Sequence, residues 1–157
     1  MIGREEKVYV LETTIDDMNP EIYAYLVEKM LREGALDAFT TPVQMKKGRP
    51  ANRLNVICRE EMLEKILQII FRETSTIGVR YREEKRRVLP RKFKEVELPW
   101  GRVRIKLCFF AEDEGEIIQA APEFEDCRRL AEENGVPLKD VYEAACAAVE
   151  KLKKSRR

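Results

Sequence analysis

The stretch "KVYVLETTIDDMNPEIYAYLVEKMLREG" (7–34) decides the fold class, because it reads as one strand followed by one amphipathic helix. Its first part, "KVYVLETT" (7–14), is rich in β-branched and aromatic residues, which is typical of a strand. Asn19 can cap a helix whose first turn contains Pro20, and apolar residues then recur at helical spacing. Gly34 ends that helix. The stretch therefore predicts a strand, a loop that begins with two acids, and a helix with one apolar face.

The same strand and helix signals recur up to residue 89. We expect a second strand, a polar loop, a third strand, a second helix and a charge-rich fourth strand at 35–45, 46–52, 53–59, 60–73 and 78–89. The order β-α-β-β-α-β predicts a ferredoxin-like antiparallel sheet. Both helices are expected on one face of that sheet, because crossover connections keep a single handedness.

Pro90 marks an expected domain boundary. Beyond it, alternating strand patterns around a Trp-Gly turn predict a β-hairpin, which is followed by a short strand and two helices. The strand and the helices are expected at 116–122, at about 123–134 and from about 138 onward. We therefore expect an α+β protein with a ferredoxin-like domain at 1–90 and a small β-sheet plus helical hairpin unit at 91–157.

The composition excludes several protein classes. The chain has 157 residues, 44% of them hydrophobic, which is enough to bury a core without disulfides. No run approaches the roughly 18 uncharged apolar residues of a membrane span, and no signal peptide is evident, so a cytoplasmic protein is expected. The chain contains no histidine, and its four cysteines lie far apart. A zinc finger or a histidine-liganded metal is therefore not expected.

Positive charge is concentrated in one part of the sequence. Charged residues make up 38% of the chain, yet the formal net charge is only +1. Residues 80–106 carry eleven Lys or Arg against four Glu, so the rest of the chain is net acidic. This pattern predicts a local basic surface and argues against a protein that binds polyanions over its whole surface.

Asp16 and Asp17 follow the first strand and are the candidate metal ligands. Mg²⁺ is commonly held by one or two carboxylates together with phosphate oxygens, and this pair has the right number and type of oxygens. We expect the first and third strands to run parallel, which would bring the loops after them to one edge of the sheet. The alternative is an exposed acidic turn that faces a surface arginine.

The loop "QMKKGRPA" (44–51) is the candidate phosphate-binding segment, because it gathers Lys46, Lys47 and Arg49 around a glycine. Ammonium and guanidinium groups bind phosphate oxygens by charge-assisted hydrogen bonds. The loop lacks the glycine spacing and the Lys-Ser/Thr pair of a Walker motif. The alternative is a solvated hairpin tip.

The turn "RETSTIGVR" (72–80) supplies three successive hydroxyl groups, Thr74, Ser75 and Thr76, next to Arg80. A helix end needs only a glycine, so the hydroxyl groups favour an anion-binding turn. Together, an acidic pair, a basic loop and a hydroxyl-rich turn match what a metal nucleoside triphosphate requires: oxygen ligands for the cation, positive charge and hydrogen bonds for the phosphates.

The sequence resembles one known family, the C-terminal domain of the nickel insertion protein that completes the nickel-pincer nucleotide cofactor of lactate racemase. The resemblance rests on "LETTIDDMNPE", "DAFTTPVQMKKGRP", "RETSTIGVR", "RRVLPR" and "PEFEDCRRLAEENGVPLKDVYEAA". These segments span the chain from about residue 8 to residue 149.

The resemblance implies a CTP-dependent cyclometallase of the lyase class. With CTP and Mg²⁺ or Mn²⁺, such an enzyme inserts nickel into a pyridinium bisthiocarboxylate mononucleotide. Family members also carry a larger N-terminal domain, often with a His-rich stretch, so a nickel-binding domain or chain absent here is an expected partner. A homo-oligomer is expected as well, whereas nucleic acid and membrane are not expected partners.

The resemblance also assigns roles to residues of this chain. Asp16 and Asp17 would bind the metal. The nucleotide would be bound by Lys46, Lys47, Arg49, Thr74, Ser75, Thr76 and Arg80. No catalytic residue is identified.

Two other readings stay open. The stretch "RRLAEENGVPLKDVYEAA" (128–145) has the spacing of a helix-turn-helix, but residues 123–157 carry as many acids as bases. DNA binding needs a basic face, which this balance does not favour. The second alternative is a non-catalytic regulatory module that binds a nucleotide and assembles through exposed sheet edges.

Overall fold

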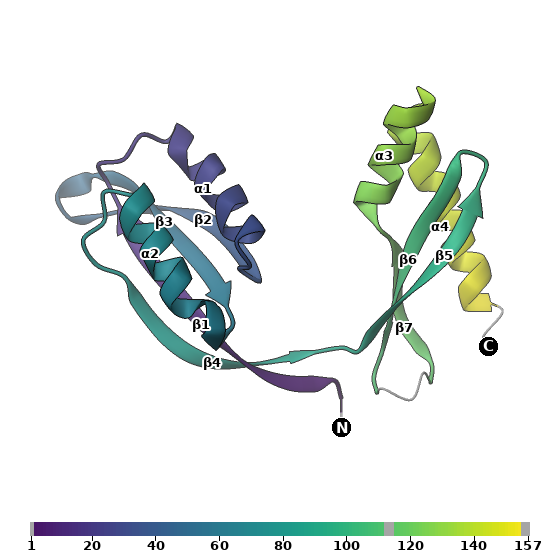
Figure 1. The fold of residues 1–157 in the computed structure, drawn as a ribbon, viewed down its shortest axis with the longest axis horizontal. Helices are drawn as coiled ribbons and strands as arrows, with labels where there is room; N and C mark the ends of the chain where they lie inside the picture. The colour runs from purple at the N-terminus through teal and green to yellow at the C-terminus, as the bar shows by residue number, and fades with distance from the viewer. Residues whose placement is uncertain (1, 112–114, 155–157) are drawn as a thin grey trace. The chain divides into compact units, whose positions relative to one another are not determined.

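The computed structural model describes residues 2–111 and 115–154 and divides into two compact units. One unit is Glu6–Arg86, and the other combines the N-terminal residues up to Glu5 with the chain from Arg87 onward. The elements of the first part of the chain are β1 (Arg4–Ile15), α1 (Glu21–Arg32), β2 (Asp37–Gln44), η1 (Lys46–Gly48), β3 (Pro50–Cys58), η2 (Glu60–Met62), α2 (Leu63–Glu73) and β4 (Arg80–Val88) (Figure 1).

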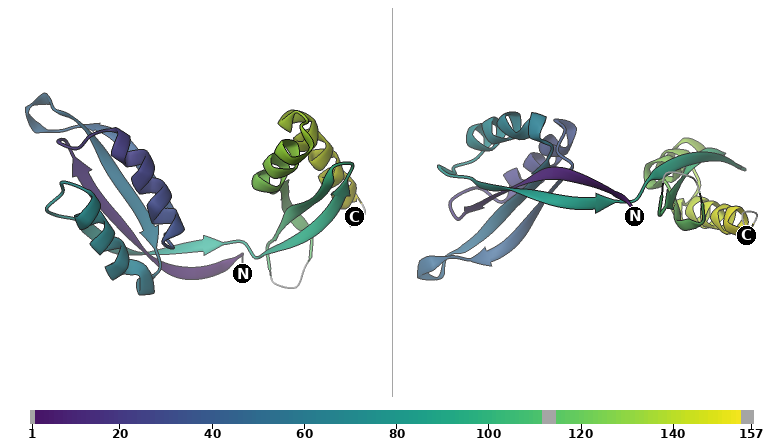
Figure 2. Two further views of the ribbon diagram at one scale, coloured as in Figure 1. Left: turned by 45° about the horizontal axis from the view of Figure 1, so that its top comes forward. Right: turned by 90° about the horizontal axis from the view of Figure 1, so that it is seen from below.

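The first unit has the ferredoxin-like fold that the sequence predicts. Its four strands lie in the order β2-β3-β1-β4, and both helices lie on one face of the sheet (Figure 2). The helices pack on that face through Leu26, Met30, Ile66 and Ile70, against Leu11 and other strand residues. The opposite face carries no helix of this unit, and we call it the open face.

α1 begins as expected. The Asn19 side chain accepts a hydrogen bond from the Glu21 backbone N–H at 3.0 Å, and Pro20 already has helical dihedral angles. The cap stops the chain from continuing in the direction of β1 and turns it back over the sheet. Asp16 and Asp17 consequently lie in the short connection between the end of β1 and the start of α1.

β1 runs antiparallel to β3, so the expectation of parallel first and third strands is wrong. The register pairs Tyr9 with Cys58 and Ile15 with Asn52. β2 is also antiparallel to β3, which makes β1 and β2 the strands that share a direction. The physical reason is that the crossover through α1 skips one strand position, and β3 fills the gap between its two strands.

Three loops nevertheless meet at one edge of this sheet. β1 and β2 end at the same edge because they run in the same direction. β4 begins at that edge, since Gly78 contacts Thr13 near the end of β1 whereas Arg86 contacts Glu6 near its start. The connections that converge there are 16–20, 45–49 and 74–79.

The second unit is a three-stranded antiparallel sheet covered by two helices. Its elements are β5 (Arg91–Leu98), β6 (Gly101–Phe109), β7 (Ile117–Pro122), α3 (Phe124–Asn134) and α4 (Leu138–Lys154), with strand order β5-β6-β7. Val103 and Ile105 on β6 pack against Leu130 and Val141 on the helices. The expected hairpin, short strand and helix pair are therefore all present.

The cysteines have no sulfur partner. All four are free, and Cys58 and Cys127 are fully buried in the two cores, as expected for small apolar residues. Within residues 2–111 and 115–154, no helix is both long and apolar enough to cross a membrane.

Candidate functional site

The acidic pair contacts both of the other predicted segments. Arg49 Nη1 donates to Asp16 Oδ2 at 3.1 Å, and Ser75 donates through its hydroxyl group to Asp17. The pair thus links the hairpin tip and the turn before β4 to the end of β1. The contact between Arg49 and Asp16 is also what the alternative of an acidic turn facing a surface arginine predicts.

The three hydroxyl groups of the turn have different partners. Thr74 Oγ1 donates to the Ile70 carbonyl oxygen at 2.7 Å and so ends α2. The hydroxyl oxygens of Thr76 and Thr13 are 2.7 Å apart, and Thr13 donates to the Gly78 carbonyl at 2.9 Å. Thr74 and Thr76 therefore hold the turn against α2 and β1. Ser75 alone is directed at the acidic pair.

The hairpin tip presents two lysines, Lys46 and Lys47. Lys47 has a φ of 63° and Gly48 a φ of 68°, and the Met45 N–H donates to the Arg49 carbonyl at 2.9 Å to close the loop. Within the residues that the structure describes, Lys46 and Lys47 form no side-chain hydrogen bond or ion pair. Both ammonium groups are therefore available to an anion.

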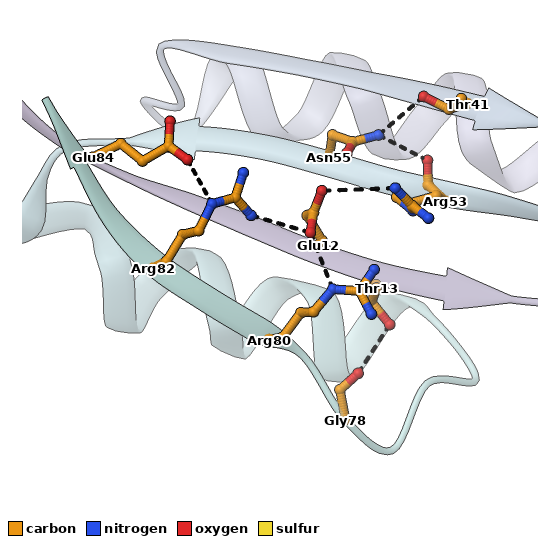
Figure 3. A network of polar contacts seen from close by, with 9 residues as sticks. All are labelled: Glu12, Thr13, Thr41, Arg53, Asn55, Gly78, Arg80, Arg82 and Glu84. Atoms are coloured by element: carbon orange, nitrogen blue, oxygen red, sulfur yellow. Dashed lines mark hydrogen bonds and ion pairs between the residues drawn. The ribbon is translucent and has the colours of Figure 1, made fainter. Parts of the chain in front are cut away.

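Arg80 belongs to a cluster of charged side chains around Glu12 that the sequence alone does not indicate. Glu12 lies on the open face, its side chain only 16% exposed, and accepts hydrogen bonds from Arg80 Nε at 3.0 Å and Arg82 Nη1 at 3.1 Å (Figure 3). Arg53 Nη1 lies 3.9 Å from the other carboxylate oxygen. The hydrogen bond from Arg80 and the surrounding guanidinium charges hold the pKa of Glu12 below its ordinary value, although burial opposes this shift.

Two features of the sequence are consistent with this cluster around Glu12. Glu12 is the one acid in the otherwise apolar and hydroxyl-rich second part of β1, residues 8–15, and Arg80 and Arg82 alternate so that they share one face of β4. These features do not reveal the strand order. Glu12 and the arginines lie side by side only because β1 lies between β3 and β4 in the sheet.

A groove of about 710 Å³ opens on the open face above this cluster. We call it the open-face groove; it is lined by Glu12, Thr13, Thr14, Val43, Gln44, Met45, Lys46, Arg53, Gly78, Val79 and Arg80. Of the predicted nucleotide residues it contains Lys46 and Arg80. Asp16, Asp17, Lys47, Arg49, Thr74, Ser75 and Thr76 do not line it.

A second hollow of about 390 Å³ lies at the end of β1, with Asp16, Met18 and Tyr23 among its lining residues. The Tyr23 hydroxyl donates to the Ile15 carbonyl at 3.2 Å, and burial together with the nearby acids raises the pKa of Tyr23. Tyr23 thereby holds the backbone at Ile15, the last residue of β1, directly before Asp16 and Asp17.

The donor set at the acidic pair limits which cations it fits. Within residues 2–111 and 115–154, no group of three or more His, Cys, Asp or Glu side chains could hold a metal. Asp16 and Asp17 therefore suit a hard cation that takes its remaining ligands from water and phosphate, as Mg²⁺ and Mn²⁺ do with nucleotides. They do not form a complete protein cage for any metal.

The comparison with known families decides the relationship. The sequence model described as "nickel insertion protein" matches residues 2–142, which is most of the chain. This chain belongs to the nickel insertion protein family. A member of the family from Thermotoga petrophila, named pyridinium-3,5-bisthiocarboxylic acid mononucleotide nickel insertion protein, is 40% identical over 142 residues. A protein of Dictyoglomus thermophilum, also named as a nickel insertion protein, is 53% identical over 137 residues.

This nickel insertion family member corresponds to one part of these relatives. The alignments cover 90% and 87% of this chain but only 35% and 34% of the two relatives. A solved structure has a TM-score of 0.83 and 36% identity, covering 94% of this chain and 99% of that chain. It is described as LarC2, the C-terminal domain of a cyclometallase involved in the synthesis of the NPN cofactor of lactate racemase. These matches confirm the family that the sequence resembles and the predicted α+β fold class.

Proposed function

We propose that this chain is the CTP- and divalent-metal-binding part of a nickel insertase that metallates a pyridinium bisthiocarboxylate mononucleotide. The observation that carries the proposal is the pair of contacts from Arg49 to Asp16 and from Ser75 to Asp17. They gather an acidic, a cationic and a hydroxyl-bearing segment at one sheet edge. The names of the relatives support the nickel substrate and the mononucleotide.

The residues at this edge would bind different parts of the metal nucleotide. Asp16 and Asp17 would hold Mg²⁺ or Mn²⁺, which when bound supplies positive charge to the triphosphate. Arg49 can exchange its bond to Asp16 for a phosphate oxygen, because its side chain is 58% exposed and free to turn. Ser75 can likewise donate to phosphate in place of Asp17. Thr74 and Thr76 keep the turn in place.

The hairpin tip would bind the outer phosphates. The ammonium groups of Lys46 and Lys47, which have no partner in the part of the chain that the structure describes, lie at the end of a two-stranded hairpin, where positive charge attracts the triphosphate from a distance. Arg80 contributes from the other side, and its guanidinium is held in place by Glu12. Nickel and the mononucleotide would enter as substrates, and a further nickel-binding domain or chain would deliver the metal.

The helix-turn-helix alternative gains no support from the second unit. The two arginines of α3 are paired with acids on the same helix, Arg128 with Glu125 at 2.7 Å and Arg129 with Glu133 at 2.8 Å. They therefore add no free positive charge for a DNA backbone. The regulatory alternative shares the nucleotide site, and the nucleotide preference tests it.

Isothermal titration calorimetry tests the proposal directly. CTP with Mg²⁺ or Mn²⁺ is expected to bind more tightly than ATP, GTP or UTP with the same metal, and CTP alone is expected to bind weakly. Equal affinity for all four nucleotides would favour the regulatory module. Salt-sensitive binding of duplex DNA, with no CTP binding, would overturn the proposal.

A further inference from the structure

We propose that the open-face groove binds a planar aromatic ring carrying two anionic groups of the carboxylate or thiocarboxylate type, with Arg53 as its central recognition residue. This inference rests on the proposed function in one respect: the ligand class is that of the mononucleotide in the names of the relatives. The position of the site follows from the groove alone.

Arg53 lies at the floor of the groove with hydrogen-bond donors that are not used. Its Nε is buried and finds no acceptor among the described residues. Its Nη1 is 3.9 Å from Glu12, which is too far for a hydrogen bond. A buried donor without an acceptor is unfavourable, so an anion that reaches Arg53 gains this hydrogen bond at little cost. The planar guanidinium suits the two oxygens, or the oxygen and sulfur, of a carboxylate-type group.

Hydroxyl groups flank this guanidinium on both neighbouring strands. The register places Thr14 of β1 and Thr41 of β2 directly opposite Arg53. Thr14 has no side-chain hydrogen bond within the described part of the chain, and Thr41 accepts one from Asn55 at 3.3 Å, so its own proton remains available. Three strands thus present a row of donors on the open face.

The charge of the groove suits two anionic groups. Three cationic side chains, Lys46, Arg53 and Arg80, line it against the single carboxylate of Glu12. Glu12 is already engaged by Arg80 and Arg82. While no nucleotide is bound, Lys46 at the rim of the groove and Arg53 are therefore its two cations that have no anionic partner at hydrogen-bond distance among the described residues.

The shape of the groove suits a flat ring. The apolar residues Val43 and Met45 are among its lining residues, and the volume of about 710 Å³ lies in the range of sites for small ligands. A flexible polyphosphate needs no apolar wall, whereas a planar ring gains contact from one. Cytosine is also a planar ring but carries no anionic group, so the pair of anionic groups is what distinguishes the proposed ligand from the base of CTP. The acidic pair does not line the groove, whereas Lys46 and Arg80 do. A metal nucleotide held at the sheet edge and a ring held at Arg53 would therefore be neighbours that share these two cations.

Pyridine-3,5-dicarboxylate is the probe for this site, because it is a planar ring with two carboxylates and no phosphate. Titration into the whole chain, followed by NMR or calorimetry, is expected to show saturable binding at millimolar concentration. Pyridine-3-carboxylate, with one anionic group, is expected to bind about tenfold more weakly. If the two probes bind equally, or neither binds, the proposal is wrong.

Arg53→Lys keeps the charge but removes the planar fork, so it should weaken dicarboxylate binding by about tenfold. Affinity for CTP with Mg²⁺ should change by less than about twofold, because Arg53 is not among the edge residues. Thr14→Val removes only a flanking hydroxyl and is expected to weaken the dicarboxylate by a smaller factor. Arg102→Lys, at an exposed arginine of the second unit, is the matched control and should change nothing.

Two outcomes separate this inference from the proposed function. Dicarboxylate binding that depends on Arg53, without any CTP binding, would support the groove and overturn the nucleotide proposal. An Arg53→Lys variant that loses as much affinity for CTP with Mg²⁺ as for the dicarboxylate would assign the groove to the nucleotide and overturn this inference. Unchanged dicarboxylate affinity in a folded Arg53→Lys variant would overturn it as well.

Discussion

Arg49 at the tip of the β2–β3 hairpin donates a hydrogen bond to Asp16 at the end of β1, across 3.1 Å. The two residues are 33 positions apart in the sequence, and their contact ties the candidate phosphate-binding loop to the candidate metal ligands. Both side chains are at least partly exposed, at 58% and 22%, so the pair contributes little to stability. Its importance lies in the proposed function, in which Asp16 would bind the metal and Arg49 would bind the phosphates of the nucleotide.

Replacing Asp16 and Asp17 together by Asn should weaken metal-dependent CTP binding by about tenfold or more, a loss of roughly 1.4 kcal/mol. Asn keeps the size and one oxygen but removes the negative charge that a divalent cation requires. Calorimetry with CTP and Mn²⁺ measures the effect, and circular dichroism should show an unchanged fold. An unaltered affinity would remove both residues from the site.

Lys46→Ala should weaken binding of CTP more than binding of cytidine. The ammonium group has no partner within the described residues, so its truncation removes only an interaction with ligand phosphate. Affinities for CTP, CMP and cytidine, measured in one buffer, give the comparison. A loss of the same size for all three ligands would mean that the loop does not contact the phosphates. Lys139→Ala, a lysine near the start of α4, serves as the control.

Glu12→Gln should destabilise the pairing of β1 with β4, by about 1–3 kcal/mol near neutral pH. The arginines around Glu12 lower its pKa in the folded state, so its stabilising effect is present above the pKa of the unfolded chain. That effect is lost as the pH falls through the lower folded pKa. The wild type and the variant should therefore converge in stability at acid pH.

Hydrogen exchange of the β1 and β4 amides between neutral and acid pH measures this convergence. Glu132→Gln, at a glutamate of α3 whose side chain is 73% exposed, should show no such difference from the wild type. If the two strands of the Glu12→Gln variant remain as protected as in the wild type at neutral pH, the cluster does not stabilise the sheet.

Gly101→Ala should destabilise the second unit by about 1–3 kcal/mol, because Gly101 has a φ of 131° that other residues rarely adopt. An added Cβ would also lie 2.8 Å from a Leu130 methyl group. Thermal unfolding followed by the fluorescence of the neighbouring Trp100, the single tryptophan, reports on this unit. Gly78→Ala is the control, since a Cβ there meets nothing within 4 Å. Equal transition temperatures for the two variants would contradict this account of the turn.

Most of the elements could be predicted because their signals are local. The Asn19 cap, the apolar stripe of α1 and the Gly135 end of α3 each depend on a few neighbouring residues, and the structure has all three. The acidic pair, the basic loop and the hydroxyl turn were also recognised as separate segments from residue types alone. Their joint role as a binding site remains a prediction.

Strand direction could not be predicted in the same way. The expectation that the first and third strands run parallel failed because no local pattern says how far a crossover helix carries the chain across the sheet. The cluster around Glu12 was missed for the same reason: Arg53 and Arg80 lie 41 and 68 positions away from it along the chain. No local sequence pattern identifies either arginine as a partner of Glu12.

The amino-acid sequence by itself determined the order of strands and helices, the turns between them and the family to which the chain belongs. Local spacing of apolar residues and capping groups is sufficient for the elements, and long stretches of shared residues are sufficient for the family. Only the tertiary structure decided the antiparallel direction of β1 and β3 and the meeting of Glu12 with its arginines. Those features depend on hydrogen bonding between distant strands, which brings side chains together across the sheet irrespective of their separation along the chain.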